Sequence, residues 1–565
     1  MKRWGYWIIV GVVSLALAAL IGWATTYTPL LTPSASEEWS RGRLLGVTPV
    51  SIPVDVQAAP DGGVFLTWVD LDDRLHVVRL GTSGQVIADW TPGVGADIPR
   101  EPRLLVGPGD EIHLIWRETG GGRSLLTYAR LSSGASVQVG PLSLSLPGDE
   151  AQSPCLAFDR QGEVEVFWVG QAGIYQVALS AEGEVQGDPV LLVEGGEDVS
   201  IQVDREGIFH LTWLQGMGPN ERVIYYALLD PEQGDLSQPE EMSRVFLRTG
   251  QRVESLAVGI DSSTGYILWV IQDLRDISSR AQYAFFPLEI PRQKKVRTLQ
   301  LDEGSDPLSL WAMRGQYETL LVALTETTMT PDGPQLQIGV IGLRGEQTSE
   351  NAVWAAVENR GSTTVVDQSS WPEDQYIVTA SDRPSLKPSL AVDTQSHLHL
   401  VWLETGGFGV YRVAYASTAP GVKENYNALT LWDVVNGALS VAMQLFLAVG
   451  LAPVLAVGWS LLPLMWLIGY HLVTGYETLT VPGARVALGV SVLLEVVCTY
   501  LLSPYRSGVP GMIRWIVPLA VAAVALLLTM LYLRKRDEQS LFGAFFVFAL
   551  IYGFFQVAFV ALLHL

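Results

Sequence analysis

The strongest constraint on this chain of 565 residues is a repeated unit that ends in tryptophan. Each copy has a short apolar run, a turn that begins with aspartate, and a second apolar run that closes on Trp. Clear copies occupy residues 154–168, 199–213 and 388–402. Weaker copies end at Trp68, Trp116 and Trp269. Alternating apolar residues bounded by turn residues are typical of β-strands, so each unit predicts a hairpin.

The spacing of the unit predicts a β-propeller. Between Trp68 and Trp269 it recurs every 45–56 residues, which fits one four-stranded blade. A single blade cannot bury both faces, whereas a closed ring of blades can. A degenerate copy at residues 309–325 brings the count to seven. The long interval before Trp402 leaves room for an insertion or a decayed eighth blade near residues 350–382. We therefore expect an all-β propeller, with seven blades favoured and eight as the alternative.

The last blade needs a strand from elsewhere in the chain. The final repeat ends near Ala416 and lacks an outermost strand, while residues 38–47 resemble one. We predict that this N-terminal stretch completes the last blade. The ring would then close and its open edge would disappear.

Apolar segments flank the predicted propeller. Residues 8–24 follow Lys2 and Arg3, and the run is longer than the ~7–15 residues of a signal-peptide core. This predicts a retained anchor with a cytoplasmic N-terminus. Charged residues are only 17% and mean hydropathy is +0.26. The expected division is an anchor and linker at 1–34, an extracytoplasmic propeller at 35–419, and a C-terminal helical transmembrane domain at 420–565.

The C-terminal part predicts several membrane crossings. Runs at 486–502, 513–533 and 541–563 are each close to the ~20 residues of a spanning helix. Residues 434–473 contain no Asp, Glu, Lys or Arg, and as one helix they would be about 60 Å long. They must bend, and Gly450, Pro453 and Gly458 offer the place. A re-entrant or interfacial segment followed by one crossing satisfies the positive-inside rule. We therefore predict five crossings in a cell membrane, with six as the alternative.

Three polar residues stand within these apolar runs. Glu495 lies near the middle of its run, and Gln444 and Gln556 lie in others. A carboxylate at that depth costs roughly 2.5–3.5 kcal/mol on insertion scales. Glu495 is therefore either a functional residue with the two glutamines as partners, or a protonated residue that only holds helices together.

Acidic residues gather in loops that a propeller places on one face. These loops follow the second strand of a blade or connect one blade to the next. The candidate ligand-binding residues are Asp70, Asp72, Asp73, Glu118, Glu404, Asp149, Glu150, Glu197 and Asp198. They predict either an acidic face for a basic partner or a cation, with calcium as the candidate ion, or ordinary solvated hairpin tips.

Other chemistry has little support in the sequence. His113, His210 and His399 occupy one repeat position, three before the Trp, so they should ring the axis as half-buried side chains and form no metal site. The only cysteines, Cys155 and Cys498, lie in different regions and form no CxxC pair. A net charge of −22 makes nucleic acid a poor partner.

Over residues 51–417 the repeats resemble the sialidase-like, Asp-box-related propellers of bacterial surface proteins. The resemblance implies the fold more than an activity, because no copy has the spacing of a true Asp box. It also implies an Arg-Ile-Pro motif near the first blade, yet this chain has Ile98, Pro99 and Arg100 in the wrong order. No catalytic residues are assigned on this basis.

Three functions fit these observations. The first is a recognition or scaffold module that binds a protein or glycan while its helices anchor it in the membrane. The second is an accessory subunit of a larger membrane complex. The third is a surface glycosidase with paired carboxylates.

Overall fold

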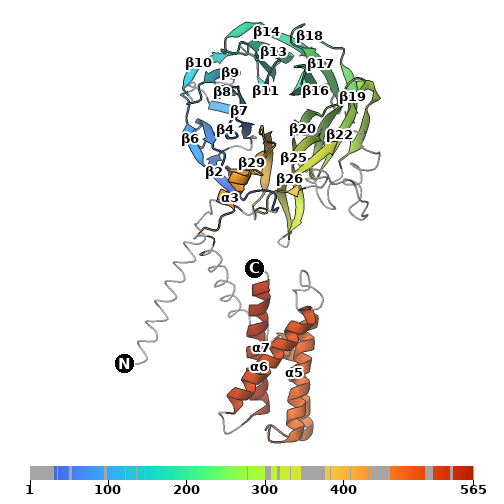
Figure 1. The fold of residues 1–565 in the computed structure, drawn as a ribbon. Coiled ribbons are helices and arrows are strands. Elements are labelled where there is room, and N and C mark those ends of the chain that lie inside the picture. Colours follow the sequence, from blue (N-terminus) through green and yellow to red (C-terminus); the bar gives the residue numbers. More distant parts are fainter. Residues whose placement is uncertain are drawn as a thin grey trace. The chain divides into compact units, whose positions relative to one another are not determined.

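The chain forms a β-propeller of seven blades. The structure, a computed structural model, describes residues 31–299, 307–344, 376–430, 458–502, 513–534 and 539–563, with short gaps inside these ranges. Its strands form seven antiparallel sheets of four or five strands each. The sheets follow one another around a ring in sequence order (Figure 1). This confirms the predicted propeller with seven blades. Much of the predicted insertion, residues 350–375, lies outside the described residues.

The blades are numbered in chain order. Blade 1 contains β3 (Asp55–Ala58), β4 (Val64–Val69), β5 (Leu75–Leu80) and β6 (Val86–Trp90). Blade 2 contains β7 (Ile98–Val106), β8 (Ile112–Gly120), β9 (Arg123–Leu131) and β10 (Val137–Ser143). Blade 3 contains β11 (Gln152–Phe158), β12 (Val164–Val169), β13 (Gly173–Leu179) and β14 (Val185–Glu194). Blade 4 contains β15 (Gly196–Val203), β16 (Phe209–Gly218), β17 (Glu221–Asp230), β18 (Asp235–Leu236) and β19 (Glu240–Phe246).

Blade 5 contains β20 (Gln251–Ile260), β21 (Thr264–Asp273), β22 (Ser278–Pro287), the 3-10 turn η1 (Pro291–Gln293) and β23 (Lys295–Thr298). Blade 6, the degenerate copy, contains β24 (Pro307–Arg314), β25 (Thr319–Thr330), β26 (Gly333–Arg344) and β27 (Tyr376–Ile377). Blade 7 contains β28 (Ser385–Val392), β29 (Leu398–Gly407) and β30 (Val410–Ser417), joined by β2 (Gly42–Thr48) and β1 (Leu31–Thr32).

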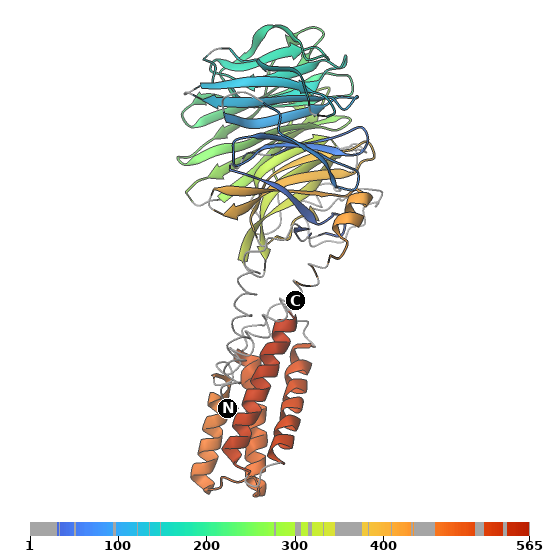
Figure 2. The same cartoon turned by 90° about the vertical axis from the view of Figure 1, so that its left-hand side faces the viewer.

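The first strand of every blade is its innermost strand. Each of these strands contacts the first strand of the next blade, and β28 of the last blade contacts β3 of the first. The inner strands therefore enclose a central channel, and the ring is closed. Figure 2 shows the blades from the side.

The last blade is completed by the N-terminal strand, as predicted. β2 pairs antiparallel with β30, with Arg43 opposite Tyr415 and Thr48 opposite Tyr411. Just before β2, Trp39 is buried and the backbone N–H of Ser40 donates to the carbonyl of Ser417 at 2.9 Å. The outermost position is therefore filled from the opposite end of the domain.

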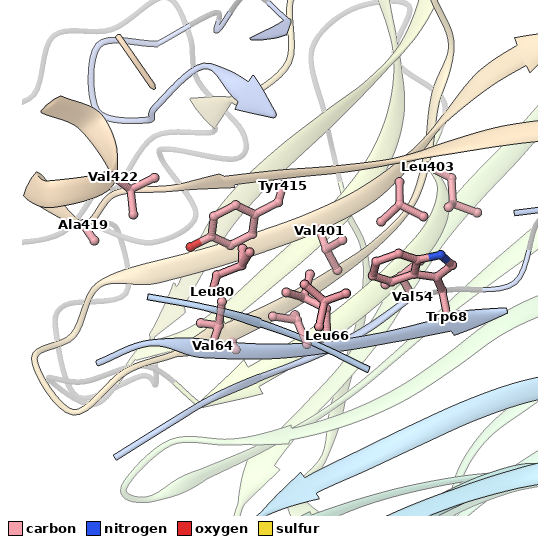
Figure 3. Close-up of a cluster of buried hydrophobic side chains, with 14 of the residues drawn as sticks. Val54, Val64, Leu66, Trp68, Leu80, Val401, Leu403, Tyr415, Ala419 and Val422 are labelled. Atoms are coloured by element: carbon pink, nitrogen blue, oxygen red, sulfur yellow. The ribbon is translucent and has the colours of Figure 1, made fainter. Parts of the chain in front are cut away.

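Apolar side chains from the first and last blades interlock where the ring closes. Val64, Leu66 and Trp68 of blade 1 pack with Val401 and Tyr415 of blade 7 (Figure 3). The short helix α3 (Pro420–Tyr426) follows β30 and adds its own apolar residues to this cluster. The contact buries apolar surface between two segments that lie more than 300 residues apart in sequence.

The repeated tryptophans pack between blades. Trp116 packs with Phe65 of blade 1, and Trp402 packs with Leu321 of blade 6. Trp168, Trp213 and Trp269 likewise pack against the preceding blade. These five blades therefore bury the tryptophan of the repeat against the preceding blade.

The aspartates of the repeat build the turns between first and second strands. Asp159 Oδ1 accepts the N–H groups two and four residues later, at 2.9 and 2.7 Å, and Asp204 and Asp393 do the same. The fourth turn residue has positive φ, with Gly207 at 82° and Ser396 at 70°. The turn thus needs aspartate at its first position and glycine or a small polar residue at its fourth.

A second compact unit, Leu429–Leu565, is helical in its described residues. Residues 458–474 form a helix, followed by α5 (Pro482–Leu502), α6 (Ile513–Leu533) and α7 (Leu541–Leu563). Among the described residues, one helix, over Pro482–Thr499, is long and apolar enough to cross a membrane. Shorter apolar helices span Leu519–Leu533 and Leu541–Gln556. The predicted anchor at 8–24 and two residues of the predicted bend, Gly450 and Pro453, lie outside the described residues, whereas Gly458 is the first described residue of the helix at 458–474.

The closing strand generates a stability prediction. A fragment of residues 52–428 lacks β1 and β2, so it exposes the edge of β30 and loses buried Trp39. We expect it to be less stable than a fragment of residues 31–428 by roughly 3–6 kcal/mol, the value of two or so buried large side chains. Urea unfolding followed by tryptophan fluorescence measures the difference. A synthetic peptide of residues 31–51 should restore stability in trans, and equal unfolding midpoints for the two fragments would refute the closure.

Candidate functional site

The two ends of the propeller differ in what they carry. Loops between second and third strands and connections between blades lie at one end, which we call the loop face. Because β30 runs away from this face and β2 pairs antiparallel with it, Arg41 before β2 and Thr418 after β30 both lie at the opposite end. We call that end the tether face. All the predicted acidic residues lie at or near the loop face.

In blade 1 the predicted carboxylates are already paired. Asp70 Oδ2 lies 2.9 Å from Nε2 of His76. Burial opposes ionisation of Asp70, but hydrogen bonds from its own turn and from His76 outweigh it and lower its pKa. Asp72 pairs with Arg74 at 2.9 Å, and Asp73 pairs with Arg100 of blade 2 at 2.8 Å.

Three of the predicted carboxylates interact with tryptophans of the repeat. Glu118 accepts a hydrogen bond from Nε1 of Trp116 at 3.1 Å, and Asp149 accepts one from Trp168 at 2.9 Å. Glu404 is 1% exposed, and burial raises its pKa. Asp149 and Glu404 are therefore part of the packed interior more than of an exposed acidic surface.

The remaining predicted carboxylates lie in the connections before blades 3 and 4. Glu150 is exposed, and Glu197 pairs with Arg222 at 2.6 Å. Asp198 is partly buried at the start of β15. Burial raises its pKa to about 6, against a hydrogen bond from Ser153 of blade 3. Asp198 therefore gains and loses its proton just below neutral pH.

The nine predicted carboxylates share one end of the propeller but do not converge. Most of them pair with an arginine, or accept hydrogen bonds from a tryptophan or from the backbone of a turn, in their own blade or the next. Within the described parts of the chain, no group of three or more His, Cys, Asp or Glu side chains is placed to hold a metal ion. Calcium binding stays a prediction that this geometry does not support.

The sequence analysis missed the inner strands, which carry a ring of β-bulges near the loop face. Register shifts interrupt the pairing of all inner strands except β3. At three of these bulges a residue other than glycine has positive φ: Glu101 at 50°, Ser153 at 47° and Lys387 at 52°. Such strained positions are concentrated at functional sites. The signal was the proline that follows each of the three, since proline cannot donate to a neighbouring strand.

Arg103 closes the channel just below this ring. It lies on β7 of blade 2, and its guanidinium carbon is 5.1 Å from the centroid of the Trp311 ring on β24 of blade 6. These blades are not neighbours, so the side chain reaches across the axis. Burial raises the pKa of Asp55 in blade 1. Burial also raises the pKa of Cys155 in blade 3, to about 12. The positive charge of Arg103 opposes both shifts. Arg103 is therefore a shared counter-charge for several blades.

A second bridge joins blades 5 and 7 at the level of the bulges. Lys387 Nζ lies 2.9 Å from Oε1 of Glu254, and Oε2 of Glu254 lies 2.7 Å from Arg252. The chain of charges runs from the channel mouth toward the groove between blades 4 and 5. In that groove lies a cavity of about 410 Å³, lined by residues that include Glu197, Arg222 and Arg252.

The repeated histidines are structural. Nδ1 of His113, His210 and His399 lies 2.7–2.8 Å from the hydroxyl of a tyrosine on the third strand of the same blade. They are 0–3% exposed, so the expected half-buried position is wrong. The tyrosine hydroxyl supplies the hydrogen bond that full burial of an imidazole requires. The three residues belong to blades 2, 4 and 7 and do not converge, as predicted.

In the helical unit, Glu495 is fully buried. One of its carboxylate oxygens accepts a hydrogen bond from Ser460 at 2.9 Å, and the other has no partner among the described residues. Gln556 is also buried, and its side-chain oxygen is likewise unpaired there. Gln444, the third predicted polar residue, lies outside the described residues.

Comparison with known proteins identifies no family. No protein family matches the chain, and no curated protein matches it. Among solved structures, an ulvan lyase from a new polysaccharide lyase family aligns with a TM-score of 0.43 and 10% identity, over 65% of this chain and 95% of that one. A protein of unknown function from Dyadobacter fermentans aligns at 0.39 and 12%, over 66% and 98%. An exo-β-1,3-galactanase from Phanerochaete chrysosporium aligns at 0.30 and 10%, over 52% and 76%. These likenesses concern the propeller fold, and the resemblance to sialidase-like repeats stays a prediction.

The raised pKa of Asp198 generates a pH prediction. At pH 7.5 the carboxylate is ionised in both the folded and unfolded states, and its burial destabilises the fold. As the pH falls below about 6, the folded state takes up a proton first, so this cost disappears. Replacing Asp198→Asn should raise unfolding free energy by about 2 kcal/mol at pH 7.5 and by almost nothing at pH 4.

Unfolding of the full chain in detergent, followed by tryptophan fluorescence at both pH values, measures this effect. Asp188→Asn, an exposed position in the neighbouring blade, is the control and should change neither value. A gain that is equal at both pH values would show that Asp198 does not titrate as its burial implies.

Proposed function

We propose that this chain is a membrane-anchored recognition or scaffold module whose propeller binds a partner outside the cytoplasm through its loop face. The observation that carries the proposal is the closure by β2, because it places both the entry to β2 at Arg41 and the exit from β30 at Thr418 at the tether face. In the proposed arrangement, the predicted anchor and the helical unit connect to the propeller from this end. The loop face is then left for a partner.

Features of the loop face support this role. It presents exposed apolar side chains, with Leu71 at 48% and Met217 at 54% exposure. It also holds the bulge ring, the Lys387–Glu254 bridge and the cavity of about 410 Å³. Exposed apolar groups beside charged ones are typical of protein interaction sites.

Site-specific photocrosslinking in the full chain, in its own cells, tests the proposal. A photoreactive residue at Met217 or Leu71, on the loop face, should give discrete crosslinked products. The control position is Glu206, which is exposed in the turn between the first two strands of blade 4, at the tether face. Products from Glu206 alone, or from none of the three positions, would contradict the proposal.

A surface glycosidase is the second candidate, and one observation favours it. Burial, and to a smaller extent the negative charge of Glu101, raises the pKa of Asp198, so a carboxyl group with a raised pKa lies near a second carboxyl group at the channel mouth. Such a pair can act as general acid and base on a glycosidic bond. A hydrolysis screen with the full chain tests it. Activity that Asp198→Asn and Glu101→Gln both abolish would replace the recognition role.

We further propose the topology of five crossings, which combines the contacts of the helical unit with the positions of its basic residues. An antiparallel bridge joins Thr478 to Ser540, and Arg485 Nε donates to the carbonyl of Leu479 at 2.8 Å. The loop before α5 and the loop before α7 therefore lie at the same end of this unit. Arg534 at the end of α6 is also there, and basic residues favour the cytoplasmic side. The helix of residues 458–474 would then enter from outside.

Thiol labelling tests this topology. A cysteine at Gln539, in a chain with Cys155→Ser and Cys498→Ser, should not react with an impermeant reagent on intact cells and should react after lysis. A second cysteine at Glu206 in the same background is the positive control. Labelling of residue 539 before lysis would restore six crossings.

A further inference from the structure

The cavity between blades 4 and 5 has a local excess of positive charge in a strongly acidic protein. Its walls come from the loop between β16 and β17 and from the connection between β19 and β20. Three arginines line it, Arg222, Arg248 and Arg252, against a single carboxylate, Glu197. The whole chain has a net charge of −22. An anionic group that approaches the propeller is therefore repelled over most of the surface and attracted here.

The three arginines differ in how they are already paired. Arg222 binds Glu197 at 2.6 Å and a backbone carbonyl at 2.9 Å. Arg252 binds Glu254 at 2.7 Å, which Lys387 also contacts. Arg248 is exposed, and its guanidinium has no ion pair or hydrogen bond within the described residues. The paired arginines are held in place, and Arg248 keeps its full set of donors for a ligand.

Exposed apolar residues lie next to the segments that line this cavity, in sequence or through backbone hydrogen bonds. Phe246 is 67% exposed and directly precedes Leu247, whose N–H donates to the carbonyl of Asn220 at 2.8 Å. Leu274 is 55% exposed, and its N–H donates to the carbonyl of Gly250 at 2.9 Å. Met217, 54% exposed, lies on the strand that leads into the β16–β17 loop. The two backbone hydrogen bonds thus tie Leu274 and the residue after Phe246 to residues that line the cavity, Gly250 and Asn220.

We infer that this cavity binds an acidic segment of a protein partner, with an aspartate or glutamate on Arg248 and an apolar neighbour against Phe246. The inference rests on the proposed recognition function and names the partner's chemistry. A carboxylate matches the planar guanidinium and can accept two of its hydrogen bonds. Phe, Met and Arg are the residue types enriched at protein interfaces, which favours a peptide over a sulfated glycan. The excess of arginine excludes a basic partner at this position.

A direct binding measurement on the full chain in detergent tests the inference. The probe is a fluorescein-labelled octapeptide of alternating glutamate and leucine, followed by fluorescence anisotropy. Arg248→Glu should weaken binding at least about tenfold, because the ligand would then meet a like charge. Phe246→Ala should weaken it several-fold. Raising the salt concentration should also reduce the affinity, because part of it comes from partly exposed charges.

The matched control is Arg205→Glu, the same charge change on an exposed arginine at the tether face of blade 4. It should leave the affinity for the acidic peptide unchanged. A second peptide, with glutamine in place of every glutamate, should bind neither the unchanged protein nor this variant. Equal affinities of the Arg248→Glu and Arg205→Glu variants would overturn the inference. So would binding of a sulfated tetrasaccharide at this cavity without binding of the peptide. If crosslinks form at Leu71 in blade 1 while the peptide ignores Arg248, the recognition function stands and only this cavity assignment fails.

Discussion

The pairing of β2 with β30 is the interaction on which the rest of the propeller depends. Without it, the last sheet would end in an open edge and the contact between blades 1 and 7 would lose its outer support. Three distant segments meet there: the guanidinium of Arg43 lies 5.6 Å from the ring centroid of Tyr426, and the Tyr426 hydroxyl donates to the carbonyl of Gly84. The N-terminal strand, the helix after the last blade and the first blade are thus fastened together. The same pairing places the entry to β2 and the exit from β30 at the tether face, so the closure of the ring and the position of these two segments have one origin.

Polar residues that look functional in the sequence mostly serve this packing. In blades 4 and 7 a turn aspartate contacts a buried histidine that is bonded in turn to a tyrosine hydroxyl, as in Asp393, His399 and Tyr415. The carboxylates of Glu118 and Asp149 likewise satisfy tryptophan N–H groups. A buried polar group without a partner costs free energy, so each deep tryptophan or histidine favours a partner nearby. The type of a polar residue therefore says little about its function here. Whether its side chain already has a hydrogen-bond or ion-pair partner within the protein says more.

This explains what the sequence allowed us to predict. Blade number, the closing strand and the inter-blade tryptophans follow from periodicity, because strand alternation and turn residues are local features of the chain. The degree of burial of His113 did not follow, since it depends on Tyr128 fifteen residues later and on the neighbouring blade. Arg103 and Lys387 were missed for a similar reason. Their partners, Trp311 and Glu254, belong to blades that are distant in sequence, and a bulge is defined only by the register of two paired strands.

The closed channel also limits how a partner can bind. Arg103 lies across the axis against Trp311, and Trp311 is itself held by a hydrogen bond from its Nε1 to the carbonyl of Leu390 at 3.1 Å. Above this pair, the Lys387–Glu254 bridge spans from blade 7 to blade 5. Both contacts tie together blades that do not touch through their sheets, so opening the channel would break ion pairs and stacking in several blades at once. A partner that threads through the axis is therefore disfavoured, whereas one that lies across the loop face can reach the cavity between blades 4 and 5 without disturbing the ring.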